Sequence, residues 1–170
     1  SDVYKRQKKS RDHSELLFKY LNLPIKIIKK TNYDLIKIKG KKEIPVINYK
    51  IPSDISSSSF FIVLTALSKN SKLRIKNINI NPSRTGIITI LKMMNVKIKK
   101  KNIRLYKGEK VADLIIQSSK KFKSINCPVK FNSAAIDEFL LIFLVAAKAE
   151  GISYFKNLSE LNEKESPRLK

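Results

Sequence analysis

The chain has 170 residues, of which 42% are hydrophobic, and it carries a formal net charge of +22 at pH 7. This length and apolar fraction suffice for a packed core and exclude a chain that is disordered throughout. A positive charge of this size is typical of proteins that bind nucleic acid. However, only six of the 36 basic residues are arginines, and the lysines are spread along the chain. Because clustered arginine and aromatic platforms are not evident, we expect nonspecific affinity for polyanions and no specific nucleic-acid partner.

Cys127 and His13 are the single cysteine and the single histidine of the sequence. An intrachain disulfide is therefore excluded, and we do not expect a metal site built from these residue types. The longest apolar run, residues 139–147, is far shorter than the roughly 20 residues of a membrane helix. We find no signal-peptide pattern, so the expected location is the cytoplasm.

Residues 1–7 read SDVYKRQ and match nothing in the pattern that follows. The segment is similar to translated adapter sequence, so we expect it to be a non-native scar and leave it out of the predicted fold. Lys170 falls within the first turn of a predicted helix. We therefore interpret the sequence as an internal fragment of a longer protein.

A short helix and a hairpin are predicted next. Ser10 or Asp12 can cap a helix that ends near Leu21. Residues 25–29 and 34–39 alternate apolar residues with lysine on either side of a polar turn, which is typical of a β-hairpin. A loop with a short extended segment follows.

A break at residues 52–54 precedes a helix over residues 56–68. The four serines at its start lower its helix propensity and would suit close packing against a neighbouring backbone. We expect these side chains of the helix to be buried: Phe60, Phe61, Val63, Leu64 and Leu67.

Alternation, turn residues and helical spacing predict the remaining elements. Strands are expected at 72–78 and 112–117, a basic hairpin at 97–101 and 103–106, and a strand at 152–155. The expected helices run from the turn at 83–86 to about 94, from 137 to 150, and onward from Ser166.

An internal repeat links two of these regions. Residues 74–78 read RIKNI and residues 154–158 read YFKNL, and each is followed by a Ser and an Arg at a helix start. Neither G-x-G-x-x-G nor a P-loop occurs in the sequence. The fold class is therefore predicted as α/β, with repeated α/β units around a core and not a Rossmann sheet.

The candidate functional residues lie at the starts of two predicted helices. The Ser166-Pro167 pair suits an N-cap followed by proline, and the free N–H groups at such an end attract anions. Lys164 and Arg168 would add two cations there, and Asp137 stands at the mouth of the preceding helix. Taken alone, the first cluster also fits a solvated charged turn, and Asp137 also fits an acid favoured by the helix dipole. Their equivalent places in the repeat make one shared cleft plausible.

Six motifs occur in the following order: S-R-D-H-S-E at 10–15, P-S-D-I-S-S at 52–57, N-P-S-R-T-G at 81–86, A-D-L at 112–114, I-D-E-F at 136–139 and K-E-S-P-R-L at 164–169. Together they resemble the 5-enolpyruvylshikimate-3-phosphate (EPSP) synthase family, also called 3-phosphoshikimate 1-carboxyvinyltransferase. The resemblance implies a transferase of the shikimate pathway for aromatic amino-acid biosynthesis. Such an enzyme moves the enolpyruvyl group of phosphoenolpyruvate to the 5-hydroxyl of shikimate 3-phosphate and releases phosphate, with no cofactor and no metal.

The resemblance also implies a fold of two halves, each made of three similar α/β units, that close over the substrates as an inside-out α/β barrel. Residues 8–52 would be the last unit of the first half. Residues 53–170 would be two units of an incomplete second half, so we expect the piece to be inactive alone and the full-length protein to be a monomer.

The family pattern also implies roles for single residues. Asp137 would contact shikimate 3-phosphate and act as the catalytic base for its 5-hydroxyl, and Glu165 would handle the proton at the enolpyruvyl methylene. Lys164 would bridge both substrates, Arg168 would bind phosphoenolpyruvate, and Arg11 would reach the shikimate phosphate. Two acid–base groups and several cations are what this addition of an alcohol to an anionic substrate requires.

The sequence departs from the family pattern at three places. Asn162 and Glu163 stand where the family has Arg-Val, Pro167 stands where it has Asp, and Ser53 stands where it has a hinge glycine. Two alternatives remain open. One is a sister enolpyruvyl transferase acting on a UDP-amino sugar, which lacks the S-R-D-H and K-E-S-x-R motifs. The other is a small basic nucleic-acid-binding protein, which only the charge suggests.

Overall fold

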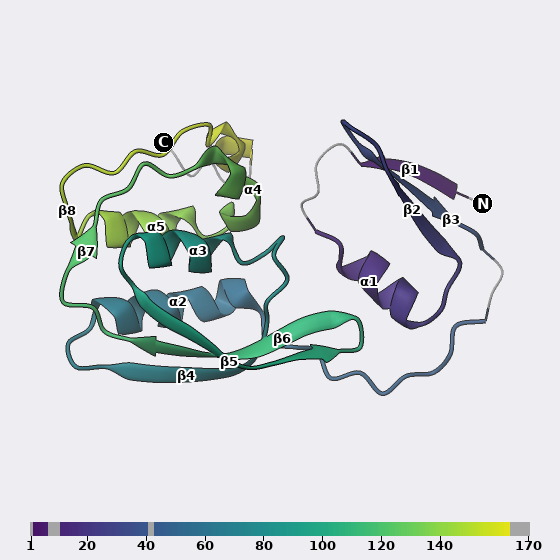
Figure 1. Cartoon of the computed structure of the whole chain (residues 1–170), viewed down its shortest axis with the longest axis horizontal. Helices are drawn as coiled ribbons and strands as arrows, with labels where there is room; N and C mark the ends of the chain where they lie inside the picture. Colours follow the sequence, from purple (N-terminus) through teal and green to yellow (C-terminus); the bar gives the residue numbers. More distant parts are fainter. Residues whose placement is uncertain (1, 7–10, 41–42, 164–170) are drawn as a thin grey trace.

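The structure, a computed structural model, describes residues 2–6, 11–40 and 43–163. The elements gather in two parts (Figure 1). We call residues 2–40 the first part and residues 53–163 the second part, and residues 43–52 join them without regular secondary structure. No helix of the described ranges is long and apolar enough to cross a membrane.

The first part is a three-stranded antiparallel sheet with one helix beside it. The strands β1 (Asp2–Arg6), β2 (Ile25–Lys29) and β3 (Asp34–Ile38) lie in the order β1-β3-β2, and the helix is α1 (His13–Tyr20). Asp12, one of the two predicted candidates, occupies the N-cap position of α1, but its side chain makes no capping hydrogen bond. The predicted hairpin is also present.

Residues 2–6, which the prediction left out of the fold, form strand β1. Asp2–Arg6 pairs with β3 over its whole length, with Asp2 opposite Ile38 and Arg6 opposite Asp34. Once β2 occupies one edge of β3, the N–H and C=O groups of its other edge still need partners, and a further strand supplies them. Residues 2–6 read DVYKR, and because their two apolar residues are adjacent they show no alternation that would identify a strand.

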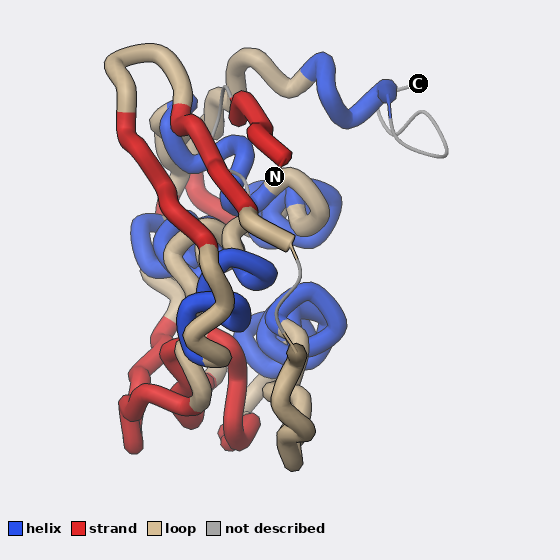
Figure 2. Tube along the Cα trace, turned by 90° about the vertical axis from the view of Figure 1, so that its right-hand side faces the viewer, coloured by secondary structure: helices blue, strands red, loops and turns tan. Residues whose placement is uncertain are grey.

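The second part is a sheet covered on one face by helices. Its strands β4 (Lys72–Asn79), β5 (Lys97–Tyr106) and β6 (Glu109–Gln117) are antiparallel in the order β4-β6-β5. The helices α2 (Ile55–Leu67), α3 (Gly86–Met93) and α5 (Phe139–Ala146) lie on one side of this sheet in both views (Figures 1 and 2).

Short elements complete the second part around these helices. They are the parallel pair β7 (Phe122–Lys123) and β8 (Ala149–Glu150), the helix α4 (Asn132–Ala135), and the 3-10 helices η1 (Val129–Phe131) and η2 (Ser159–Glu163).

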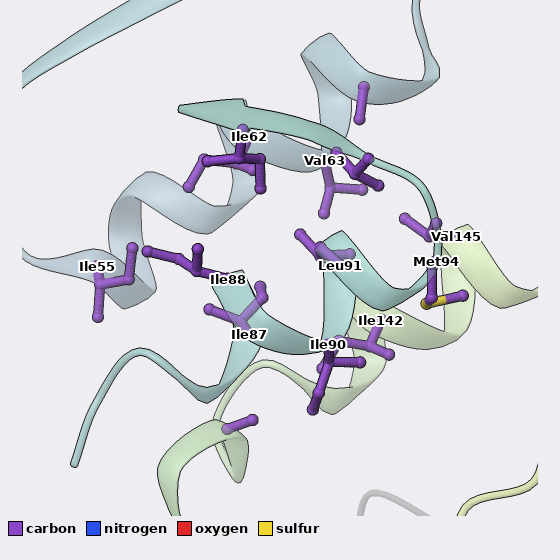
Figure 3. Packing of buried hydrophobic residues seen from close by; sticks show 14 of the residues in the cluster. Ile55, Ile62, Val63, Ile87, Ile88, Ile90, Leu91, Met94, Ile142 and Val145 are labelled. Carbon is purple, nitrogen blue, oxygen red and sulfur yellow. The ribbon is translucent and has the colours of Figure 1, made fainter. Parts of the chain in front are cut away.

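The core of the second part lies where helices α2, α3 and α5 pack together above the sheet (Figure 3). Ile62 of α2, Leu91 of α3 and Ile142 of α5 are each 0% exposed. Leu114 and Ile116 of β6 close the sheet side. Each such side chain contributes about 1.5–3 kcal/mol through burial, so this core holds the elements that carry the site.

The buried face of α2 differs from the prediction. Phe60, Phe61 and Leu64 were expected to be buried and are 64%, 60% and 63% exposed, so that prediction is wrong. Val63 is buried as expected, and Ser59 is 0% exposed. Apolar residues fill almost every position after the serines, so the sequence of α2 defines no single apolar face. The buried face instead includes the small Ser59, whose hydroxyl donates to the Ser56 carbonyl of the same helix at 2.5 Å.

The hairpin expected within residues 97–106 is also wrong, because these residues form the single strand β5. Asn102 has φ 50° and the register shifts between Lys101 and Arg104, so the polar residue is a bulge and not a turn. The true turn joins β5 to β6 through Lys107 and Gly108, whose φ values are 47° and 89°. Positive φ at both positions fits a tight two-residue turn.

Near the C-terminus, α5 is shorter than the helix expected over 137–150. The strand expected at 152–155 is absent from the described chain, where Tyr154 forms only an isolated parallel bridge with Asn126. The internal repeat nevertheless recurs in the backbone. Asn77 and Asn157, which occupy the same place in it, have φ 56° and 57°, and asparagine tolerates this left-handed conformation better than most residues.

Candidate active site

Asp137 is held by arginines from both parts of the molecule. It lies in the turn between α4 and α5, and its Oδ2 accepts hydrogen bonds from Arg11 Nη2 at 2.8 Å and from Arg84 Nη1 at 2.9 Å. The Arg11 side chain is 57% exposed, whereas that of Arg84 is 15% exposed. Asp137 therefore has one firmly enclosed cation and one that solvent or an anion can reach.

A compact loop before α3 places Arg84. The carbonyl of Asn81 accepts from the Arg84 N–H at 2.9 Å, and the Asn81 side-chain oxygen accepts from the Ser83 N–H at 3.0 Å. A Cβ added to Gly86 would lie 2.7 Å from the backbone carbon of Ala134. Glycine thus lets the start of α3 press against α4, which brings Arg84 next to Asp137.

Arg84 also reaches the start of α2. Its Nη2 donates to Ser56 Oγ at 2.6 Å, and the Ser56 hydroxyl donates to Glu138 Oε1. Glu138 is 2% exposed. Burial raises the pKa of its carboxyl, while the Ser56 hydrogen bond and the charge of Arg84 oppose that rise. The serine thus connects a buried cation to a buried acid.

Asp54 is the third acid near Arg84, with Oδ1 at 3.7 Å from Arg84 Nη2. It is also the N-cap of α2, accepting from the Ser57 N–H at 2.7 Å and from the Ser57 hydroxyl at 3.0 Å. Burial alone would raise the pKa of Asp54, but these hydrogen bonds and the charge of Arg84 hold it below its usual value. The carboxylate is therefore ionised at neutral pH.

A hollow of about 340 Å³ opens beside this cluster. Asp54 and Arg84 line it from the second part, and His13 lines it from the first. Charged groups of both signs around a concave space can orient a small anionic ligand that also carries hydroxyl groups. Among the described residues, no group of three or more His, Cys, Asp or Glu side chains could hold a metal ion.

The structure brings two of the predicted site residues together, namely Asp137 and Arg11. Lys164, Glu165 and Arg168 lie outside the described residues. The 3-10 helix η2, with Leu161 fully buried, leads toward them.

The sequence interpretation missed four polar residues of the cluster. They are Asp54, Ser56, Arg84 and Glu138. Three of the six motifs, P-S-D-I-S-S, N-P-S-R-T-G and I-D-E-F, contain them. The sequence motifs could have suggested that these polar residues belong to one site. Only the fold shows that Ser56 and Asp137, which are 28 and 53 positions from Arg84, contact its guanidinium group.

Asp113, in the A-D-L motif, has a structural place away from this cluster. Its carboxylate accepts from Arg74 Nη2 at 2.7 Å, from the Asn77 N–H at 3.0 Å and from Asn102 Nδ2 at 2.8 Å. The Arg74 hydrogen bond and the two others hold the pKa of Asp113 far below its usual value. Asp113 thereby fixes the irregular positions of β4 and β5.

Solved structures place the molecule in the EPSP synthase class of folds. One, of EPSP synthase from Acinetobacter baumannii, has a TM-score of 0.87 and 34% identity and covers 98% of this chain and 37% of its own. Another structure of EPSP synthase from the same organism has a TM-score of 0.77 and covers 88% of this chain. The predicted fold class is thus confirmed.

A family model described as EPSP synthase (3-phosphoshikimate 1-carboxyvinyltransferase) matches residues 4–170. The chain belongs to this family, as its motifs indicated. Among curated relatives, the 3-phosphoshikimate 1-carboxyvinyltransferase of Legionella pneumophila (strain Corby) is 42% identical over 160 residues, 94% of this chain. That of Caldicellulosiruptor bescii is 39% identical over 168 residues, 99% of this chain. The chain spans 36% and 38% of the lengths of these two relatives.

Proposed function

We propose that the chain takes part in transfer of the enolpyruvyl group from phosphoenolpyruvate to the 5-hydroxyl of shikimate 3-phosphate, with release of phosphate. The observation that carries this proposal is the Asp137 carboxylate held by Arg11 and Arg84. Membership of the EPSP synthase family supports the same reaction. It also favours shikimate 3-phosphate over a UDP-amino sugar as the acceptor.

Asp137 is the proposed base. Addition of the 5-hydroxyl to the enolpyruvyl double bond removes a proton from oxygen and places one on the methylene carbon. Release of phosphate then requires that a proton leave the same carbon, which restores the double bond. A carboxylate fixed by the enclosed Arg84 is suited to accept the hydroxyl proton, because its position is set before the substrate arrives. Glu165 is the proposed group for the two proton transfers at carbon.

The cations are proposed to bind the anionic groups of both substrates. Arg11, whose side chain is 57% exposed, would exchange its contact with Asp137 for the phosphate of shikimate 3-phosphate. Lys164 would lie between the two substrates, and Arg168 would bind phosphoenolpyruvate. Neutralising these charges in a site that excludes water lowers the barrier more than it would in bulk solvent.

We further propose that residues 8–52 and 53–170 belong to two halves that close on the substrates, with the crossover near Pro52. A full-length protein of this kind would act as a monomer in the cytoplasm, where phosphorylated metabolites are held. The net charge of +22 would give it only nonspecific affinity for nucleic acid.

The test is phosphate release by a chimera with the Legionella pneumophila (strain Corby) relative. The 160 matched residues of that relative are replaced by those of this chain. We expect the chimera to release phosphate from shikimate 3-phosphate and phosphoenolpyruvate, and the 170-residue chain alone to release none. A folded chimera without activity would contradict the proposal.

The nucleic-acid alternative is tested by filter binding across a salt series. Electrostatic binding without specificity weakens steeply as salt increases. Tight binding to one nucleic-acid sequence that persists at high salt would favour that alternative and contradict the proposed function.

A further inference from the structure

Three consecutive residues at the start of α1 cross from the first part to the second. Arg11 reaches Asp137 at 2.8 Å, and Asp12 Oδ1 accepts from Asn81 Nδ2 at 2.7 Å. His13 Nδ1 contacts Glu109 Oε1. The three partners come from three separate segments of the second part, so these contacts fix both the position and the orientation of the short helix.

Glu109 is the least expected member of this set. Its side chain is 6% exposed, and its Oε2 has no hydrogen-bond partner among the described residues. A carboxylate buried in this way costs free energy unless a charge or a donor compensates it. His13 is the side-chain partner that the structure gives it. Retaining such a group in the contact between the two parts points to a role other than stability.

The turn that carries Glu109 fits closely against α1. Gly108 has φ 89°, and a Cβ there would lie 2.7 Å from the Leu16 carbonyl oxygen and 3.3 Å from Tyr20 Cβ. The helix itself has eight residues and none of them is buried. A helix this short is marginal on its own, so its place depends on the turn and on the polar contacts at its start.

We propose that His13 and Glu109 are positioning residues for the enolpyruvyl transfer. By fixing the start of α1 on the β5–β6 turn, they hold Arg11 where its guanidinium group reaches Asp137 and the phosphate of shikimate 3-phosphate. Asp12, paired with Asn81, is the second fixed point of the same segment. The inference rests on the proposed function, because it assigns Arg11 to that substrate.

A positioning role for His13 and Glu109 predicts a change in KM that a simple loss of stability does not. A less stable protein contains less active enzyme, so its kcat falls while its KM values stay the same. A misplaced Arg11 instead weakens binding of one substrate. Loss of the His13–Glu109 contact should therefore raise KM for shikimate 3-phosphate and leave KM for phosphoenolpyruvate nearly unchanged.

The kinetic experiment uses the chimera with His13→Ala and Glu109→Ala. We expect KM for shikimate 3-phosphate to rise on the order of ten-fold in each variant, with less than about a two-fold change in KM for phosphoenolpyruvate. His13→Asn keeps a donor at nearly the place of Nδ1 and should restore most of the loss. Because the two residues act together, the double variant should be no worse than either single one.

The matched control is Arg74→Gln, which breaks the 2.7 Å pair with Asp113 inside the second part. We expect it to leave both KM values unchanged. An unsubstituted chimera without activity overturns the proposed function. An active chimera in which His13→Ala leaves KM for shikimate 3-phosphate unchanged overturns this inference alone.

A second measurement uses the 170-residue chain itself. Amide hydrogen exchange of α1 should become faster in Glu109→Ala, while exchange of α2 stays as in the unchanged chain. Arg74→Gln should leave α1 unaffected. Equal exchange of α1 in the Glu109→Ala variant and in the unchanged chain would overturn the inference without reference to activity.

Discussion

The second part of the chain has a continuous apolar core, whereas the first part has almost none. Leu91, Phe139 and Leu114 are 0% exposed in the second part. Among residues 2–6 and 11–40, the only buried apolar residue is Ile36, which is 9% exposed. Because burial of apolar surface is the main favourable term in folding, the described residues of the first part gain little stability from a core of their own.

The two arginines at Asp137 differ in the same way. Arg84 stands on the packed part, is 15% exposed and contacts Ser56 as well as Asp137. Arg11 stands on the weakly packed part and is 57% exposed. Arg84 is thus enclosed by the packed part, whereas Arg11 is open to solvent.

The largest effect is expected from Ile62→Ala on α2. Ile62 is 0% exposed, so its truncation leaves a cavity and lowers the free energy of unfolding by about 2–5 kcal/mol. Leu64→Ala on the same helix removes a side chain that is 63% exposed and should change it by less than about 0.5 kcal/mol. Urea unfolding measures both. Equal losses would contradict the observed face of α2.

The next effect separates the two arginines. Arg84→Met leaves Asp137, Asp54 and Glu138 without their enclosed cation and should cost about 2–3 kcal/mol, somewhat less than for a fully buried pair. Arg11→Met breaks an exposed pair and should cost less than about 1 kcal/mol. The same unfolding experiment compares them. A larger loss for Arg11→Met would reverse the comparison between the two parts.

The free energy of unfolding should depend on pH through the ionisation of Asp113. Its folded-state pKa lies below the ordinary value of 3.8, so its stabilising contribution is present above that value and is lost as pH falls through the lower one. Stability measured from about pH 5 to pH 2 should therefore fall less steeply in Asp113→Asn than in the unchanged chain. Parallel curves would show that the pKa of Asp113 is not lowered in solution.

The smallest effect is expected from Glu138→Gln. Burial raises the folded-state pKa of Glu138 above its ordinary value of 4.5, so ionisation of this group opposes folding as pH rises through the raised value. The amide keeps an acceptor for the Ser56 hydroxyl without the charge. The variant should be as stable as the unchanged chain near pH 4.5 and slightly more stable near neutral pH. A loss of stability at neutral pH would contradict this sign.

Local patterns in the sequence predicted much of this molecule. The start of α1 after Asp12, the β2–β3 hairpin and the repeat with its asparagines Asn77 and Asn157 follow from short-range signals that the backbone obeys. The conformation of the polar residues between apolar runs was harder to predict. Asn102 adopts the same positive φ as a turn residue, yet it forms a bulge because β6 continues past it on the other side.

The buried face of α2 and most of the site depended on tertiary structure. An almost uniformly apolar helix such as α2 gives no signal for which side packs, and Phe60 is exposed because Ser59 faces the core instead. Asp137 and Arg11 were recognised through family motifs. The contact of Arg84 with Asp137, across 53 positions, arises from the packing of α3 beside α4 and has no local signal.

The most direct test of the proposed site is the turnover of the chimera with Asp137→Asn. The amide matches the carboxylate in shape but cannot accept the hydroxyl proton, so we expect phosphate release to fall by on the order of 10²-fold or more. The matched control is Lys99→Ala, an exposed residue of β5, which should release phosphate at the rate of the unsubstituted chimera. An Asp137→Asn chimera as active as the Lys99→Ala control would contradict Asp137 as the base.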